Sequence, residues 1–267
     1  MHPIERLRYV ARASGVEQAQ LVRETADSLT TFRHDPAGMV MACRRMLARH
    51  PTSGPLWWLA SRVCTAVDPV AEAHRSADLF DADRTARELA LALPEDATVC
   101  VLGWPEVAAH ALPPRGDLEI LVVDIAHEAS GLVRRLQRAD VDAVEVPLAG
   151  LGAAAASSHV LLVEAQAMGP DALIAVAGSR AAAATTLQAG GQVWAVTGVG
   201  RILPDAVWRV VAERFGAAAE PWDLDDEIVP LDLVTAVVGS RGLEDPAAAL
   251  AHGDTPVAPE LFKEGVL

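Results

Sequence analysis

The feature that most restricts the fold of this chain is a series of six short apolar runs that follows Pro94. Each run is rich in Val, Ile and Leu, and the runs alternate with stretches of helical composition. Continuous apolar strands that alternate with helices are typical of a parallel sheet covered on both faces. The predicted strands are 98–103, 118–124, 142–148, 159–165, 173–178 and 192–198. We therefore predict an α/β fold with a Rossmann-like, doubly wound, mostly parallel sheet over residues 95–250.

The residues before the first apolar run show helical spacing. Ser14–Glu17 has the spacing of a capping box, and Asp35 followed by Pro36 is typical of a helix start. Helices are expected at about 17–32, 36–50, 55–67 and 69–93. We predict a helical domain over residues 1–94 and a C-terminal tail, 251–267, that packs on the surface or at an interface.

Composition and charge exclude several classes of function. Hydrophobic residues make up 51% of the chain, which is enough to form a buried core. The formal net charge of −14 repels phosphate backbones and argues against nucleic-acid binding. No apolar run approaches the roughly 18 residues of a membrane span, and the N-terminus lacks the apolar region of a secretory signal. We therefore expect a cytoplasmic protein that binds neither nucleic acid nor a membrane.

The cysteines and histidines predict neither a disulfide framework nor a metal site. Cys43, Cys64 and Cys100 are far apart and odd in number, which is typical of proteins whose thiols stay reduced. None belongs to a CxxC motif, and the eight histidines form no HxxxH or HxH. Residues 198–200 form a GxG after a predicted strand, but Leu203 stands where a dinucleotide fingerprint needs its third glycine. We expect no metal and no cofactor.

The stretch EAQAMGPDALIAVAGS, residues 164–179, lies where α/β proteins place ligand sites, beyond the carboxyl end of a strand. Gly178 and Ser179 open the following predicted helix. Ser179 is a candidate N-cap, and the free amides of such a helix start attract anions. Arg201, after the next strand, would add a positive charge to the same rim. The alternatives are an ordinary capped helix and a solvated arginine.

Three carboxylates in this region are candidate catalytic bases. Asp124 ends a predicted strand, where it either serves a site or caps the following helix. Glu164 and Asp171 flank the loop of the 164–179 stretch, and each is either a base or a solvated loop carboxylate.

Four segments resemble the motifs of one family, in the right order. VLLVEAQAMGPDALIAVAGS (160–179) is similar to V-L-L-G-A-D-A followed by N-K-x-G-T, and RHPTSGPLWW (49–58) is similar to R-P-T-x-x-x-L-[FW]-W. LVVDIAHEASG (121–131) resembles V-V-E-S-R-P-x-x-x-G, and residues 227–246 resemble a C-terminal V-P-P-E-L-I-T motif. The family contains methylthioribose-1-phosphate isomerase, ribose-1,5-bisphosphate isomerase and the α, β and δ subunits of initiation factor 2B. The resemblance covers residues 15–247 and implies a helical domain followed by a Rossmann-like domain of the sugar-phosphate isomerase type.

The departures from the family motifs fall on the positions that carry the chemistry. The resemblance aligns the isomerases' catalytic cysteine with Gly103 and their aspartate with Ala165. The family's asparagine–lysine pair aligns with residues 175–176, and His50 and Ala126 stand in place of two arginines. Moving a hydrogen between sugar carbons needs an acid and a base within reach, and glycine and alanine supply neither. The resemblance therefore implies that no residue at these catalytic positions is active.

These departures leave three hypotheses. The first is a non-catalytic family member that binds a sugar phosphate or a nucleoside monophosphate and forms a homodimer or a hetero-oligomer with a paralogue. Its ligand residues would be Gly178, Ser179, Arg201 and His50. The second is an aldose–ketose isomerase for a ribose-1-phosphate-type substrate with rearranged catalytic residues, which would be Asp124, Glu164 and Asp171. The third is a pure scaffold subunit that pairs with a catalytic paralogue.

Overall fold

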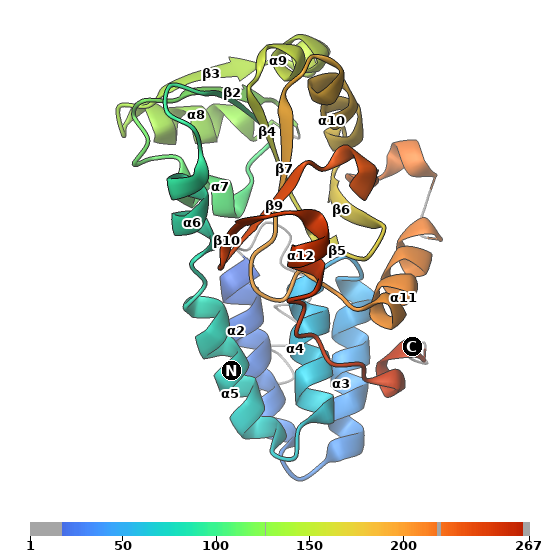
Figure 1. The fold of residues 1–267 in the computed structure, drawn as a ribbon. Helices are drawn as coiled ribbons and strands as arrows, with labels where there is room; N and C mark the ends of the chain where they lie inside the picture. The colour runs from blue at the N-terminus through green and yellow to red at the C-terminus, as the bar shows by residue number, and fades with distance from the viewer. Residues whose placement is uncertain (1–17, 126, 218–219, 264–267) are drawn as a thin grey trace.

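The computed structural model describes residues 18–125, 127–217 and 220–263 of the 267-residue chain. A layer of helices lies at one end of the molecule and an α/β layer at the other (Figure 1). The predicted capping box at Ser14–Glu17 lies outside the described residues.

The N-terminal helices begin where local sequence signals predict. Asp35 accepts a hydrogen bond from the Gly38 amide at the start of one helix, and Pro36 is its first residue, as expected. Trp57 and Trp58 are fully buried in the core that these helices share. The helices are α2 (Gln18–Leu29), α3 (Pro36–Arg49), α4 (Gly54–Thr65) and α5 (Pro69–Asp81).

The single helix predicted over 69–93 is wrong, because the chain breaks between α5 and α6 (Thr85–Ala92). Asp83 lies in the break and accepts hydrogen bonds from the amide and the hydroxyl of Thr85, at 2.9 and 2.6 Å. Its second oxygen accepts the Val199 amide at 2.9 Å. The break turns α6 away from the helical layer and onto the sheet, where Leu89 joins the sheet core.

The predicted mostly parallel sheet is confirmed. Within the described ranges it has seven strands in the order β10-β9-β7-β4-β1-β2-β3, and β10 alone runs antiparallel to its neighbour. Five of the six predicted strands belong to it. The strands are β1 (Thr98–Leu102), β2 (Glu119–Val123), β3 (Asp142–Val146), β4 (Val160–Glu164), β7 (Gln192–Val196), β9 (Ala236–Gly239) and β10 (Gly242–Glu244).

The sixth predicted strand does not join this sheet. Residues of the 173–178 run form β6 (Ala172–Val176), the middle strand of a separate three-stranded antiparallel sheet in the described part of the chain. Its partners are β5 (Ala167–Met168) and β8 (Asp226–Pro230). The apolar pattern misled the prediction because any strand buried on both faces has it, whichever sheet it enters.

Helices cover both faces of the main sheet. Alternate residues of β1 show the two faces: Val99 and Val101 pack with α6, α7 and α8, whereas Cys100 and Leu102 pack with α9, α10 and α12. The bounds are α7 (Glu106–Ala111), α8 (Ala129–Gln137), α9 (Leu151–Ser157), α10 (Ser179–Gln188) and α12 (Pro246–Leu250). None of the helices in the described ranges has the length and apolar character needed to cross a membrane.

Two later segments return to the helical layer. Helix α11 (Asp205–Gly216) places Trp208 and Phe215 in the core formed by α2 to α5. The C-terminal tail adds Leu261, which is fully buried there. The tail runs along the outside of the helical layer (Figure 1), and a few of its side chains, Leu261 among them, are buried against that layer.

Candidate functional site

The strand order reverses between β1 and β4, and this switch point is where open α/β sheets bind ligands. Strands β2 and β3 extend from one side of β1, whereas β4, β7 and β9 extend from the other. Gly103 follows β1 and Ala165 follows β4, so the two positions that the motif resemblance aligns with catalytic residues flank the switch point.

Gly103 has a backbone conformation that disfavours any side chain. Its φ is +63°, in the left-handed region that suits glycine, and its amide donates to the Val123 carbonyl at 2.9 Å. The chain therefore turns here in a way that a cysteine would adopt only with strain. Ala165, which the resemblance aligns with the isomerases' aspartate, is fully buried.

Glu164 occupies the switch point with its own carboxylate. One oxygen accepts hydrogen bonds from the amides of Val107 and Ala108, at 2.9 and 3.4 Å, at the start of α7. The other oxygen lies 3.1 Å from Nη2 of Arg201. Helix starts and arginines are the groups that usually bind anionic ligands, and here they hold a side chain of the protein.

Arg201 lies inside the protein, where the Glu164 carboxylate balances its charge. Its side chain is 3% exposed, and Nη1 donates to the Ala165 carbonyl at 2.6 Å. Glu164, its ion-pair partner, has a side chain that is 10% exposed. The sequence placed Arg201 on an open rim, whereas the structure places it beneath the switch point as the partner of Glu164.

The start of α10 has a different cap from the one predicted. Gly178, with φ +96°, is the N-cap, and Ser179 is the first helical residue, is buried and makes no capping hydrogen bond. The Arg180 amide donates to a carboxylate oxygen of Glu227 at 2.8 Å. A Cβ at Gly178 would lie 3.1 Å from Leu151, so apolar side chains also border this helix start.

The remaining sequence candidates have structural contacts. Asp124 accepts the Ala129 amide at 3.2 Å, which is the helix-capping alternative, and its other oxygen lies 3.5 Å from Nδ1 of His127. Asp171 accepts a hydrogen bond from the Trp208 indole at 2.7 Å. His50 is the C-cap of α3, and its backbone amide donates to Met46. Ala126 lies outside the described residues.

Burial raises the pKa of one carboxyl group near the start of α10, that of Asp226. Asp226, in β8, pairs in register with Val176, two residues before the α10 N-cap. Desolvation of its carboxyl, with the nearby charge of Asp225 as a second cause, raises the pKa of Asp226 to about 6. Among the described residues, no group of three or more side chains could hold a metal ion.

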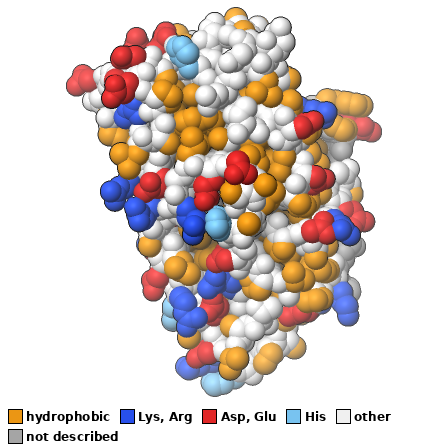
Figure 2. All heavy atoms as spheres, in the orientation of Figure 1, with side chains coloured by type: hydrophobic (Ala, Val, Ile, Leu, Met, Phe, Trp, Pro, Cys, Tyr) orange, Lys and Arg blue, Asp and Glu red, His pale blue; other side chains and the backbone are white. Residues whose placement is uncertain are grey.

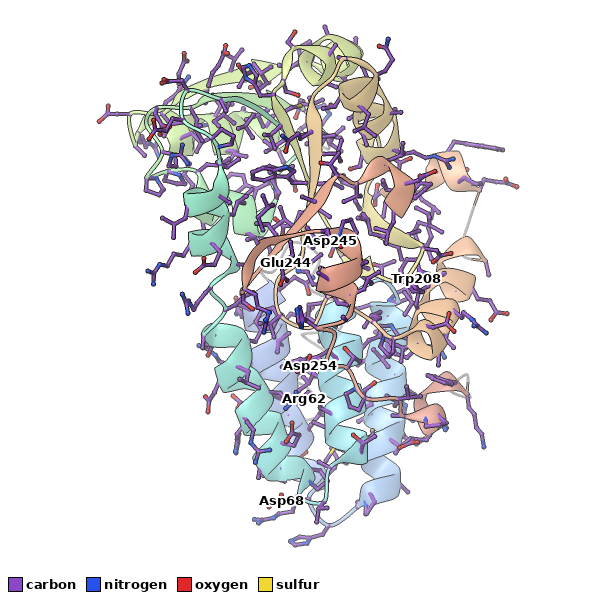
Figure 3. The ribbon with its side chains drawn as sticks, in the orientation of Figure 1. Arg62, Asp68, Trp208, Glu244, Asp245 and Asp254 are labelled. Atoms are coloured by element: carbon purple, nitrogen blue, oxygen red, sulfur yellow. The ribbon has the colours of Figure 1, made fainter. Side chains whose placement is uncertain are left out.

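The structure also has a cavity that the sequence analysis did not predict. It has a volume of about 280 Å³. It lies between the loop after β7 (residues 197–202, the β7 loop), the β9–β10 hairpin and the start of the tail. Basic and acidic side chains alternate across the middle of this face (Figure 2). Glu244 and Asp254 both line the cavity, and Asp254 lies next to Arg62 (Figure 3). The GxG at 198–200 lines this cavity, and it is the sequence feature that points to it.

The charged groups of the cavity are paired with one another. Glu244 lies 3.4 Å from Nε2 of His252 and 3.7 Å from Nε of Arg241. Asp254 accepts hydrogen bonds from the Trp58 indole, at 2.9 Å, and from Arg62, at 2.8 Å. The lining therefore has no clear excess of either charge.

Comparison with solved structures gives a consistent match. The translation initiation factor eIF-2B of Pyrococcus horikoshii OT3 superposes with a TM-score of 0.73 at 12% identity, over 93% of this chain and 98% of that one. In a tetrameric eIF2B-β2-δ2 complex from Chaetomium thermophilum, a chain superposes with a TM-score of 0.77 at 14% identity, over 93% and 92%. The eIF2B β subunit of Chaetomium thermophilum gives 0.71 at 15% identity, over 98% and 92%. No protein-family model matches the sequence, and no curated protein matches it. The chain therefore has the eIF2B-like fold that its degenerate motifs predicted.

Proposed function

We propose that this chain is a non-catalytic member of the eIF2B-like proteins and acts by assembly with itself or with a paralogue. The observation that carries the proposal is the Glu164 carboxylate at the switch point, held by two α7 amides and by Arg201. A substrate anion there would have to displace this carboxylate from all three contacts. The neighbouring positions, Gly103 and Ala165, offer no acid or base.

The contacts of the rearranged candidates weigh against an isomerase. Asp124 caps α8 and Asp171 binds the Trp208 indole, so each carboxylate already has a structural partner. Glu164, the third candidate, is held by the Arg201 ion pair. A general base needs a carboxylate oxygen that reaches the substrate. In each of these three residues a protein contact would compete with the substrate for the carboxylate.

The assembly half of the proposal is supported by a comparison. One of the solved neighbours is a tetramer of two different eIF2B subunits, β and δ. We extend that behaviour to this chain as a homodimer or a hetero-oligomer with a paralogue. A sugar phosphate or a nucleoside monophosphate is disfavoured as a ligand, because at the α10 start it would have to displace Glu227 from the Arg180 amide.

The test combines size, binding and turnover on the purified chain. Light scattering after gel filtration should give the mass of a dimer or larger assembly, and affinity capture from a lysate of the source organism should retain a paralogue if the partner is heterologous. Thermal shift with ribose 1-phosphate, ribose 1,5-bisphosphate, AMP and inorganic phosphate should show no selective stabilisation. A ligand at 100 times its Kd would add about 2.7 kcal/mol, so saturating binding would be visible. A monomer that captures no paralogue would overturn the assembly half of the proposal, and turnover of either ribose phosphate would overturn the non-catalytic half.

A further inference from the structure

The cavity beside the β7 loop lies at the carboxyl ends of two adjacent parallel strands. Residues 197–200 follow β7 and residues 240–241 follow β9, and both segments line it. The carboxyl ends of the strands form the ligand-binding edge of an open α/β sheet. Trp58 of α4 and Leu79 of α5 border the cavity from the helical layer (Figure 1). The cavity therefore lies where the two layers meet, on the same edge of the sheet as the switch point but apart from it.

Glu244 lines this cavity with a carboxylate that is only loosely paired. Its contacts with His252, at 3.4 Å, and with Arg241, at 3.7 Å, both use Oε1. Charge-assisted hydrogen bonds between nitrogen and a carboxylate are about 2.7–2.9 Å long, so both contacts are longer than such a bond. Within the described ranges, Oε2 of Glu244 takes part in no hydrogen bond or ion pair. Glu244 can therefore accept hydrogen bonds from a cationic group of a ligand.

Hydrogen-bond donors without a partner line the same cavity. Among the residues that the structure describes, Arg241 contacts only Glu244, through Nε, and its side chain is 62% exposed. The amides of Gly198 and Gly200 donate to no group in that part of the chain. Gly200 has a φ of +76°, which glycine adopts without strain. Arginines and free backbone amides of such loops are groups that bind carboxylates.

The rest of the lining limits the size and polarity of a ligand. Val237 and Ala249 are buried and line the cavity together with Leu79, which offers an apolar surface between the charged groups. The volume of about 280 Å³ is near the lower end of the roughly 300–1,000 Å³ typical of ligand pockets. The cavity therefore suits a small metabolite with an apolar part.

The charges of the lining select against a ligand with one sign of charge. The acids Glu244 and Asp254 line the cavity together with the bases Arg241 and His252, and Glu244 and Asp254 come from different segments (Figure 3). A phosphate ester would meet two carboxylates, and a simple amine would meet the arginine. A ligand that carries both an ammonium and a carboxylate group can pair with both kinds of side chain.

We propose that this cavity binds a small zwitterion of the α-amino acid class. The ammonium group lies against Glu244, the carboxylate lies against Arg241 and the amides of the β7 loop, and an apolar side chain packs on Val237 and Ala249. This inference does not rest on the proposed function, because binding here and assembly of the chain are measured separately.

The experiment is calorimetric titration of the full chain with the standard L-amino acids, each followed by analogues that lack one charge. For leucine these analogues are isocaproate, which lacks the ammonium group, and isoamylamine, which lacks the carboxylate. An apolar amino acid should bind, and each analogue should bind about 10–100-fold more weakly, since a hydrogen bond to a charged group is lost. Binding of no amino acid, or equal affinity for the analogues, would overturn the proposal. Binding of AMP or ribose 1-phosphate in place of amino acids would do the same.

Variants with similar side-chain size locate the site. Glu244→Gln should weaken binding of the amino acid about 10–100-fold and should abolish the preference for leucine over isocaproate. Arg241→Gln should abolish the preference for leucine over isoamylamine. These ratios would not change if the two residues only supported the fold. Glu213→Gln, at an exposed position of α11 outside the cavity, is the matched control and should bind as the unmodified chain does. Unchanged ratios in both cavity variants would place the amino acid elsewhere and contradict the assignment.

Discussion

Arg201 and Glu164 form an ion pair that is nearly closed to solvent, and its two charges depend on each other. Replacing Arg201 with Met leaves the Glu164 carboxylate buried with only its amide partners. Removing one partner of a buried pair typically costs about 3–5 kcal/mol, since the other charge stays desolvated. We expect Arg201→Met to lower the free energy of unfolding by that amount, measured by urea denaturation at pH 7.

Two further variants give this prediction its control. Asp205–Arg209 is an ion pair on the exposed face of α11, with side chains 53% and 75% exposed, so Arg209→Met should cost about 1 kcal/mol or less. The double variant Glu164→Gln/Arg201→Met removes both charges and should be more stable than Arg201→Met alone. Equal losses for the exposed and buried arginines would show that the Glu164 contact is weak.

Asp226 gives the folded protein a dependence on mildly acidic pH. Its pKa is about 6 in the folded chain and 3.8 in its unperturbed form, so the unfolded state releases its proton first as the pH rises. This group therefore costs stability progressively between about pH 4 and pH 6, and the full cost persists at pH 7. Asp226→Asn should raise the free energy of unfolding by about 1–3 kcal/mol at pH 7 and by little at pH 4. Asp223→Asn, at an exposed position, is the control, and an equal gain at both pH values would contradict the assignment.

The carboxylate of Asp83 stabilises the break between α5 and α6. Asp83 binds Thr85 at the start of α6 and Val199 in the β7 loop, so it joins the helical layer to the sheet. Asp83→Ala removes a helix-start contact and a charge-assisted hydrogen bond, which together are worth about 2–4 kcal/mol. Hydrogen exchange should rise at α6 and at 197–201 together. Faster exchange at α6 alone would mean that Asp83 does not couple the two segments.

The sequence predicts these elements where their causes are local. Asp35 and Pro36 start α3 through contacts within a few residues, so the pattern identified the helix correctly. The break at Asp83 has a local part, the hydrogen bonds from Thr85, and a distant part, the hydrogen bond from Val199. Val199 is 116 positions away, and no local pattern contains that contact. The same holds for β6, whose apolar run fits either sheet and whose partner β8 comes about fifty residues later.

The candidate site also has features that the sequence predicts and features that depend on contacts between distant segments. The absence of reactive side chains at Gly103 and Ala165 could be inferred from the motif resemblance alone, and the eIF2B-like fold agrees with the resemblance. The pairing of Glu164 with Arg201 could not, because it requires β4 and β7 to lie side by side. The sequence predicts each residue in a separate role, Glu164 as a candidate base and Arg201 as a cation that binds an anionic ligand. Their contact gives them a joint structural role at the switch point.

The C-terminal tail connects helices that are distant from it in the sequence. Asp254 binds Trp58 and Arg62 of α4, and Arg62 also reaches Glu72 of α5, with Nε 2.6 Å from the carboxylate. Further along, the Leu261 carbonyl accepts a hydrogen bond from Arg214 of α11 at 3.2 Å. The tail therefore contacts α4 and α11 directly and is linked to α5 through Arg62.

The last prediction tests whether the tail is part of the cooperative core. Leu261 is 0% exposed in the helical core, whereas Val257, four residues earlier, is 42% exposed. Leu261→Ala should lower the free energy of unfolding by about 2–4 kcal/mol through lost burial and a cavity, and Val257→Ala should change it by about 0.5 kcal/mol or less. Both are measured by denaturant unfolding, with the slope of the transition compared to that of the unmodified chain. If the tail folds with the core, the Leu261 variant keeps one transition and the same slope, because the same surface is exposed on unfolding. A small loss of stability, or a separate early transition, would mean that the tail docks onto a core that is complete without it.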